Sequence, residues 1–226
     1  IHCLITDEGG RRMVAAQETT LQQLLQGGWQ YQVPLYQRTY SWGDAQLARL
    51  WDDLIKVAED RTDQPNANHF IGSLVLAPSP TNGPGGVQQY LVIDGQQRLT
   101  TLMLLTRGVL DALVERGSDL VDQVRRLLWN PADLAKQTHQ QYKLWPRRRD
   151  RDMWKIVMGD GAAPTGDHLY EQARRFFAQQ AREAMTGEDG SDRSEALVHA
   201  LLGLFKLVVI DMEDNDDAQV IFEVLN

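Results

Sequence analysis

"VIDGQQRLTTLMLL", residues 92–105, joins two apolar segments through a short polar junction. The apolar residues that end at Ile93 are typical of a buried strand, and those from Leu99 onward continue as a long, largely buried helix. Between them stand five residues: Asp94, Gly95, Gln96, Gln97 and Arg98. A strand that turns directly into a helix predicts an α/β unit with polar groups at the carboxyl end of the strand.

The junction admits two interpretations. A helix start exposes unpaired backbone N–H groups and the positive end of the helix dipole, which bind phosphate. Gly95 then allows a close approach, Gln96 and Gln97 offer amide donors, and Arg98 offers a bidentate fork. Asp94 suits a magnesium ion, a water or a clamp on Arg98. In the alternative, Asp94 caps the helix and pairs with Arg98 while the glutamines face solvent, and local chemistry permits both.

The rest of the chain alternates between strand and helix patterns. Strands are predicted at the start of 29–42, at 69–78, at 88–95 and at 206–212, with a short extended piece at 141–146. Helices are predicted at 18–28, 41–60, 96–117, 119–129, 150–158, 167–186, 193–205 and 216–226. This order predicts an α+β (mixed α/β) fold and not a helical bundle.

Local signals set the expected ends of three elements. Gly27 and Gly28 predict a helix stop, because glycine accepts the left-handed conformation that ends helices. Pro34 cannot donate to a central ladder, so the strand before it is expected at a sheet edge, entering a loop. Ser41 is the expected N-cap of the next helix, with Asp44 in its first turn.

Composition limits the class of protein. The 226 residues carry a net charge of −8, which excludes a uniformly basic nucleic-acid-binding surface but permits a local basic patch. One cysteine, Cys3, excludes a disulfide framework and a cysteine-rich metal site. The histidines show no paired metal-ligand spacing: His2, His69, His139, His168 and His199. No apolar run reaches membrane-spanning length and no signal peptide is visible, so we expect a cytoplasmic protein with no membrane partner.

We expect residues 17–226 to form one domain, with an α/β core over about 17–116 and a mostly helical part over 117–226 that returns one strand. Residues 1–16 are an N-terminal tail of uncertain function.

A second motif, "YQVPLYQRTYSW" at residues 31–42, interleaves aromatic rings with an arginine and amides. Such a surface combines stacking with an anion contact, as nucleic-acid readers do. The alternative is that Tyr31, Val33 and Leu35 fill a core. A core has no need of Gln37 and Arg38.

The densest basic run is "WPRRRDRDMWK" at 145–155, with Arg147, Arg148 and Arg149, and smaller pairs stand at 125–126 and 174–175. The run is either a footprint for a DNA backbone or a solvated face on which acidic neighbours offset the arginines. The acidic stretch 211–218 is expected to cap a helix at a strand-to-helix turn. A metal site is the less favoured interpretation.

These motifs carry a family resemblance. "VPLYQRTYSW", "HFIGSLVL" and "YLVIDGQQRLTTLMLL", followed late by "VVIDMEDNDDAQVIFEVLN", resemble the N-terminal domain of GmrSD-type restriction proteins, whose fold is similar to ParB and sulfiredoxin. "YQVPLYQR" and "KLWPRRRDRDMW" are most similar to the SspE-type effectors of phosphorothioate-based DNA defence.

The resemblance implies an NTPase, with GTP and Mg²⁺ expected. Such a protein senses modified DNA and couples nucleotide hydrolysis to the restriction of foreign DNA in antiphage defence. The resemblance assigns nucleotide binding to Gln37, Arg38, Asp94, Gly95, Gln96, Gln97 and Arg98, with catalysis by Asp94, Gln97 and Arg98. Asp94 is the possible magnesium ligand. It assigns phosphorothioate-DNA sensing to Tyr31, Gln32, Val33, Pro34, Leu35 and Tyr36. It also favours DNA contact by the basic run, for which Arg147, Arg148 and Arg149 are the candidates. A small apolar dent beside a basic clamp suits sulfur, which is larger and less hydrated than oxygen.

The sequence departs from two known enzyme patterns. It has no GxxxxGK[ST], so an NTPase here is not of the P-loop type. Cys3 stands far from the junction, so sulfiredoxin chemistry is not expected. We expect no nuclease activity in these residues, because the family carries its nuclease in a C-terminal domain. The competing hypothesis is a DNA- or partner-binding module in which the junction is structural.

Overall fold

One mixed sheet of seven strands organises the part of the chain that the structure describes. The computed structural model describes residues 2–6, 12–60, 69–80, 82, 86–161, 163–187 and 192–212. The strands are β1 (His2–Thr6), β2 (Arg12–Thr20), β3 (Trp29–Gln32), β4 (His69–Pro78), β5 (Gln88–Asp94), β6 (Leu144–Trp145) and β7 (Phe205–Asp211). They lie in the order β1-β2-β7-β4-β5-β3-β6. The predicted α+β class is confirmed.

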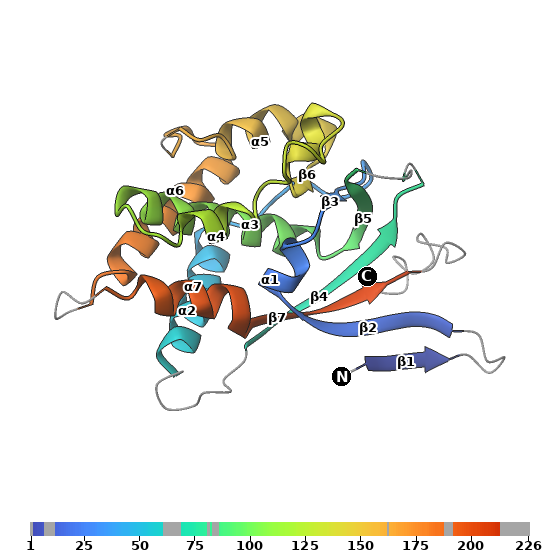
Figure 1. The fold of residues 1–226 in the computed structure, drawn as a ribbon, viewed down its shortest axis with the longest axis horizontal. Helices are drawn as coiled ribbons and strands as arrows, with labels where there is room; N and C mark the ends of the chain where they lie inside the picture. Colours follow the sequence, from blue (N-terminus) through green and yellow to red (C-terminus); the bar gives the residue numbers. More distant parts are fainter. Residues whose placement is uncertain are drawn as a thin grey trace.

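Most of the helices lie together on one side of this sheet (Figure 1). They are α1 (Leu21–Leu25), α2 (Asp44–Asp60), α3 (Gln96–Glu115), α4 (Val121–Arg125), α5 (Arg151–Val157), α6 (Leu169–Ala184) and α7 (Ser194–His199), with short 3-10 turns at Thr138–Gln141 and Arg148–Asp150 and a π turn at Ala200–Leu204. Leu74, Leu76 and Val92 of the sheet belong to the same buried cluster as Leu99 and Leu102 of α3. The long helix is therefore packed on the sheet, as its apolar sequence predicts.

The late strand occupies a central place. β7 pairs in parallel with β4 and antiparallel with β2, so the predicted returning strand joins the sheet between elements that precede it by more than a hundred residues. On the far side of β2 lies β1, with His2 opposite Gln17. Sequence periodicity does not predict β1 or β2, and the stretch expected as an N-terminal tail contributes backbone to the sheet.

The predicted edge position of β3 is wrong. Tyr31 pairs with Tyr90 of β5 on one side and with Leu144 of β6 on the other, both in parallel. β6 has only two residues, and so short a partner leaves no periodic signal. Pro34 follows the strand, so its missing N–H removes no ladder hydrogen bond.

Two predicted end signals act in another way. Gly27 and Gly28 are not among the residues with positive φ; a Cβ on Gly27 would instead lie 2.0 Å from a ring carbon of Trp29. The glycine therefore makes room for that ring. Ser41 stands outside α2, which begins at Asp44, and its backbone N–H donates to Gln97 Oε1 over 2.9 Å.

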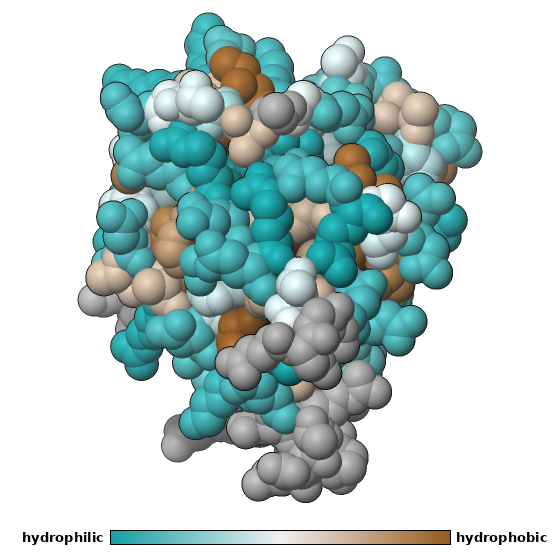
Figure 2. Space-filling view, turned by 90° about the vertical axis from the view of Figure 1, so that its left-hand side faces the viewer, coloured by the Kyte–Doolittle hydropathy of each residue, from teal (hydrophilic) through white to brown (hydrophobic). Residues whose placement is uncertain are grey.

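The remaining predicted helices are found with altered bounds. The stretch 119–129 holds only the short α4, and 193–205 is α7 followed by the π turn. The predicted helix at 216–226 and most of the acidic stretch 211–218 lie outside the described residues. In the part of the chain that is described, no helix has both the length and the apolarity needed to cross a bilayer. The helical end of the molecule is mostly hydrophilic, with apolar residues scattered over it (Figure 2).

Candidate functional site

The strand–helix junction is built on a glycine. Gly95 is the N-cap of α3 and has φ 85° and ψ 12°, in the left-handed region. A Cβ at this position would lie 2.6 Å from Leu74 Cδ2 and 2.7 Å from Ser73 O. The N-cap is Gly95 and no side-chain hydrogen bond caps the helix start. Asp94 is therefore not the cap that the structural interpretation of the junction requires. The first-turn N–H groups of α3 remain available to an anion.

A pocket of about 400 Å³ opens at this helix start. Its walls are the junction, residues 94–98, and the facing loop, from which Tyr36, Gln37, Arg38 and Trp42 contribute. The two sequence motifs, more than fifty residues apart in the chain, thus form one site. Among the described residues that line it, Asp94 is the only one with a carboxylate.

Glutamine amides hold the loop against the helix. Gln37 Nε2 donates to Ile93 O over 2.6 Å, and Gln97 Nε2 donates to Thr39 O over 2.9 Å. Gln97 Oε1 accepts from the Ser41 N–H. Since Gln96 and Gln97 are both buried, neither faces solvent as the structural interpretation expects. Their amides position the walls of the pocket.

Arg98 lies along β4. Its Nη1 donates to Ser73 O over 2.5 Å, and a Cβ on Gly72, which has φ 115°, would lie 2.5 Å from Arg98 Cζ. Burial lowers the pKa of Arg98, and the charge of Asp94 partly offsets this. Yet no ion pair joins Asp94 to Arg98 within the described residues. Sequence reasoning missed Gly72 and Ser73, although a glycine inside the strand pattern is a signal of close approach.

The second arginine of the pocket is Arg38, which is exposed at its mouth. Gln96, buried in the first turn of α3, donates its Nε2 to Arg38 O over 2.9 Å and so fixes the backbone that carries this side chain. A half-buried and an exposed guanidinium beside an open helix start make the pocket suited to a phosphate group.

Arg147 is a support of the loop. Its Nη1 donates to Gln37 O over 2.9 Å and its Nη2 to Thr39 Oγ1 over 3.0 Å, while Asp150 pairs with it at 3.2 Å. Only 15% of its side chain is exposed, which leaves little of it for a DNA backbone. Its neighbours Arg148 and Arg149 are exposed. DNA contact by these three arginines stays a prediction, which the geometry favours for the latter two.

The stretch assigned to phosphorothioate sensing divides by exposure. Tyr31 and Val33 are buried, and Gln32 and Pro34 are partly buried. Leu35 and Tyr36 are exposed. Leu35 is 75% exposed and Tyr36 61%, the highest values among the large apolar side chains described. An apolar contact to DNA is therefore available at the end of the stretch and not at its start.

Other candidate groups serve the fold. Thr100 and Thr101, which follow the junction residues in α3, are buried. Arg174 has no exposed surface and pairs with Asp111 at 2.7 Å, so it offers nothing to DNA. His168 caps α6. In the described ranges, no three His, Cys, Asp or Glu side chains gather as a metal site.

A comparison with protein families agrees with this assembly of motifs. The sequence model described as "GmrSD restriction endonuclease, N-terminal domain" matches residues 21–226, which include the loop, the junction and β7. A comparison with curated proteins finds no match. Since the family match covers far more than half of the sequence, the chain belongs to the family of GmrSD restriction endonuclease N-terminal domains.

Proposed function

We propose that this domain binds and hydrolyses a nucleoside triphosphate, with GTP preferred, and that it couples hydrolysis to sensing of modified DNA in an antiphage restriction effector. A nuclease domain of the same protein would be its downstream partner. The family match supports a role in restriction, and the proposal adds the nucleotide and the modification.

The observation that carries the nucleotide is the uncapped start of α3 between two arginines. Arg98 is anchored on Ser73 O, so its guanidinium is fixed before a ligand arrives, and Arg38 lies at the mouth. Backbone N–H groups, the helix dipole and two guanidinium groups together neutralise a polyphosphate without a P-loop.

Mg²⁺ fits this donor set. Magnesium in nucleotide sites is commonly held by one or two carboxylates together with phosphate oxygens, and Asp94 provides one carboxylate at the junction. Bound there, the ion would offset phosphate charge and Arg98 would bind the transferred group. Gln97 acts as a positioning residue, since its amide is engaged with Thr39 and Ser41.

Phosphate release from GTP in the presence of Mg²⁺ tests this proposal. Arg98→Ala is expected to reduce turnover on the order of 100-fold, because a charge-assisted contact to the phosphate is lost. Lys56→Ala removes an exposed cation from α2, away from the pocket, and is expected to leave turnover unchanged. Absence of hydrolysis by the wild-type full-length protein, with and without modified DNA, would overturn the proposal.

A second candidate is a DNA- or partner-binding module without catalysis. The glutamine hydrogen bonds favour it, because they show that much of the junction motif is engaged in holding the loop. In that case Arg98→Ala lowers the melting temperature and leaves DNA binding unchanged. A thermal melt beside the turnover assay separates the two candidates.

For the DNA, we propose that Leu35 and Tyr36 contact the sulfur of a phosphorothioate, with Arg148 and Arg149 on the backbone. Both side chains are exposed, and Tyr36 lines the junction pocket together with Arg38, which suits a poorly hydrated, polarizable atom beside a phosphate charge. Leu35→Ser should weaken binding of a phosphorothioate duplex about tenfold and of the ordinary duplex hardly at all. Ile156→Ser, which alters an apolar side chain 54% exposed on α5, is the control. If the wild-type protein bound both duplexes with equal affinity, sulfur sensing would be refuted, and the proposed nucleotide hydrolysis would be unaffected.

A further inference from the structure

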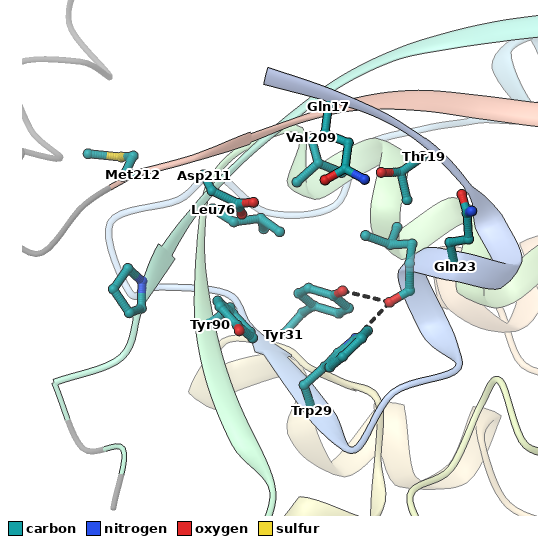
Figure 3. Close-up of a pocket in the computed structure, with 12 residues that line it drawn as sticks. Gln17, Thr19, Gln23, Trp29, Tyr31, Leu76, Tyr90, Val209, Asp211 and Met212 are labelled. Carbon is teal, nitrogen blue, oxygen red and sulfur yellow. Dashed lines mark hydrogen bonds between the residues drawn. The ribbon is translucent and has the colours of Figure 1, made fainter. Parts of the chain in front are cut away.

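A second pocket lies on the helix-facing side of the sheet, beside α1. Its volume is about 460 Å³, and its walls come from β2, β3, β4, β5, β7 and α1. Figure 3 shows the rings of Trp29, Tyr31 and Tyr90 along one side of it and Asp211 across from them. It shares no lining residue with the junction pocket.

The aromatic wall is fixed in place by one carbonyl group. Trp29 Nε1 and Tyr31 Oη each donate to Leu24 O, both over 2.7 Å, as the dashed lines in Figure 3 show. Both polar tips are thus turned to α1. Tyr31 and Tyr90 have ring centroids 6.2 Å apart and planes inclined by 34°. The rings of Trp29 and Tyr90 are partly buried and remain accessible to a ligand, whereas Tyr31 is buried and supports this wall.

The opposite wall carries a carboxylate without a cation. Asp211 ends β7 and projects toward the rings of Tyr31 and Tyr90. Among the described residues, no Lys, Arg or His lines the pocket and Asp211 forms no ion pair. It is exposed at one side, yet nearby atoms desolvate the carboxyl and raise its pKa. The hydroxyl of Thr19 and the amide of Gln17 lie along the same side.

We propose that this pocket binds the guanidinium group of a small organic cation. A carboxylate and π faces both attract positive charge, and without a basic residue the pocket repels phosphate. Guanidinium is planar, stacks on aromatic faces and donates N–H groups in a fork to a carboxylate. The acceptors here are spread along one wall opposite flat rings, which matches that shape. A compact, strongly hydrated ammonium needs its acceptors gathered around one point.

This site goes beyond the proposed nucleotide site, because the two pockets require ligands of opposite charge. It also gives a role to residues that the junction does not use. Tyr31, assigned from sequence to DNA sensing, would instead hold the floor of a cation pocket through its bond to Leu24 O.

Calorimetric titration with n-butylguanidinium tests the proposal, with n-butylurea as a neutral probe of the same shape. We expect the guanidinium to bind the wild-type protein and the urea to bind at least about tenfold more weakly. Asp211→Asn, which keeps the shape of the side chain, should weaken guanidinium binding by a similar factor. Asp52→Asn, which neutralises an exposed carboxylate on α2, should have no effect.

Three outcomes would overturn the proposal. They are the absence of guanidinium binding to the wild-type protein, equal binding of the urea, and equal weakening by Asp211→Asn and Asp52→Asn, which would indicate general attraction to an acidic protein. Tyr90→Leu provides an independent reading, since it removes a π face without changing charge and should also weaken the guanidinium. A melting curve of each variant confirms that it is folded.

Discussion

The junction pocket and the aromatic pocket differ in what provides their polar groups. The junction pocket forms where β5 ends, so its attraction for anions comes from free backbone N–H groups and two arginines. The aromatic pocket forms on the face of the sheet, where every strand is paired, so its chemistry comes from side chains alone. β3 starts in the aromatic pocket, and the loop that follows it becomes a wall of the junction pocket. The position of a group along a strand thus decides which kind of ligand it can serve.

Reversal of one charge should separate the two pockets most strongly. Arg98→Glu is expected to lower GTP affinity on the order of 100-fold or more, because it removes a phosphate contact and adds repulsion. Binding of n-butylguanidinium should stay within about twofold, since no residue is shared. Titration of both ligands measures this.

Lys56→Glu makes the same charge change on the exposed side of α2 and is expected to affect neither ligand. If folded Arg98→Glu lost binding of both GTP and n-butylguanidinium, the two pockets would be coupled and could not be treated as separate sites.

The junction should also be more sensitive than other parts of the chain to replacement of a glycine with positive φ. Gly95→Ala places a Cβ at positive φ and 2.7 Å from Ser73 O, so we expect it to lower the free energy of unfolding by about 2–4 kcal/mol. Gly117 also has positive φ, at 64°, but nothing lies within 4 Å of its added Cβ. Gly117→Ala should therefore cost only about 1 kcal/mol. Urea denaturation measures both; equal losses would mean that the close contact at the junction is relieved at little cost.

Acid should weaken the aromatic pocket through one group. Desolvation raises the pKa of Asp211, so its carboxylate becomes neutral at a higher pH than an ordinary aspartate does. Guanidinium affinity is expected to fall, by up to about tenfold, as the pH falls through that pKa. Asp211 is the one carboxylate among the described residues of the lining, which include no amine, guanidinium or imidazole group. Titrations across pH should show no such fall in Asp211→Asn; a fall that persists there would assign the effect elsewhere.

Much of the fold follows from local sequence patterns. The change from a buried strand to a long helix at residues 92–105 is correctly predicted, as are β4 and the late strand β7, because each has enough residues for a periodic signal. The predicted extended piece at 141–146 contains β6, but the pairing of β6 with β3 is not predicted, because two residues carry no period. Ser41 was predicted to be a cap, and its acceptor, Gln97, is 56 residues away.

For the candidate site too, the sequence shows the local residue types but not the contacts between segments that are far apart in the chain. Residue types near the junction indicate a candidate anion site, but the groups that position Arg98 come from Gly72 and Ser73 on another strand. Arg147 looks like any other member of a basic run until the fold brings it to the loop. The aromatic pocket has no motif at all, since Trp29, Tyr90 and Asp211 meet only in the sheet.

The central position of β7 has a consequence for synthesis of the chain. β1 and β2 connect to the other strands only through β7, which ends at Asp211. While the ribosome is still making residues 205–211, the inner edges of β2 and β4 have no partner, and such edges invite pairing with other chains. β4 is also the strand on which Arg98 rests. The aromatic pocket, which Val209 and Asp211 of β7 help to line, is therefore completed only when this strand joins the sheet.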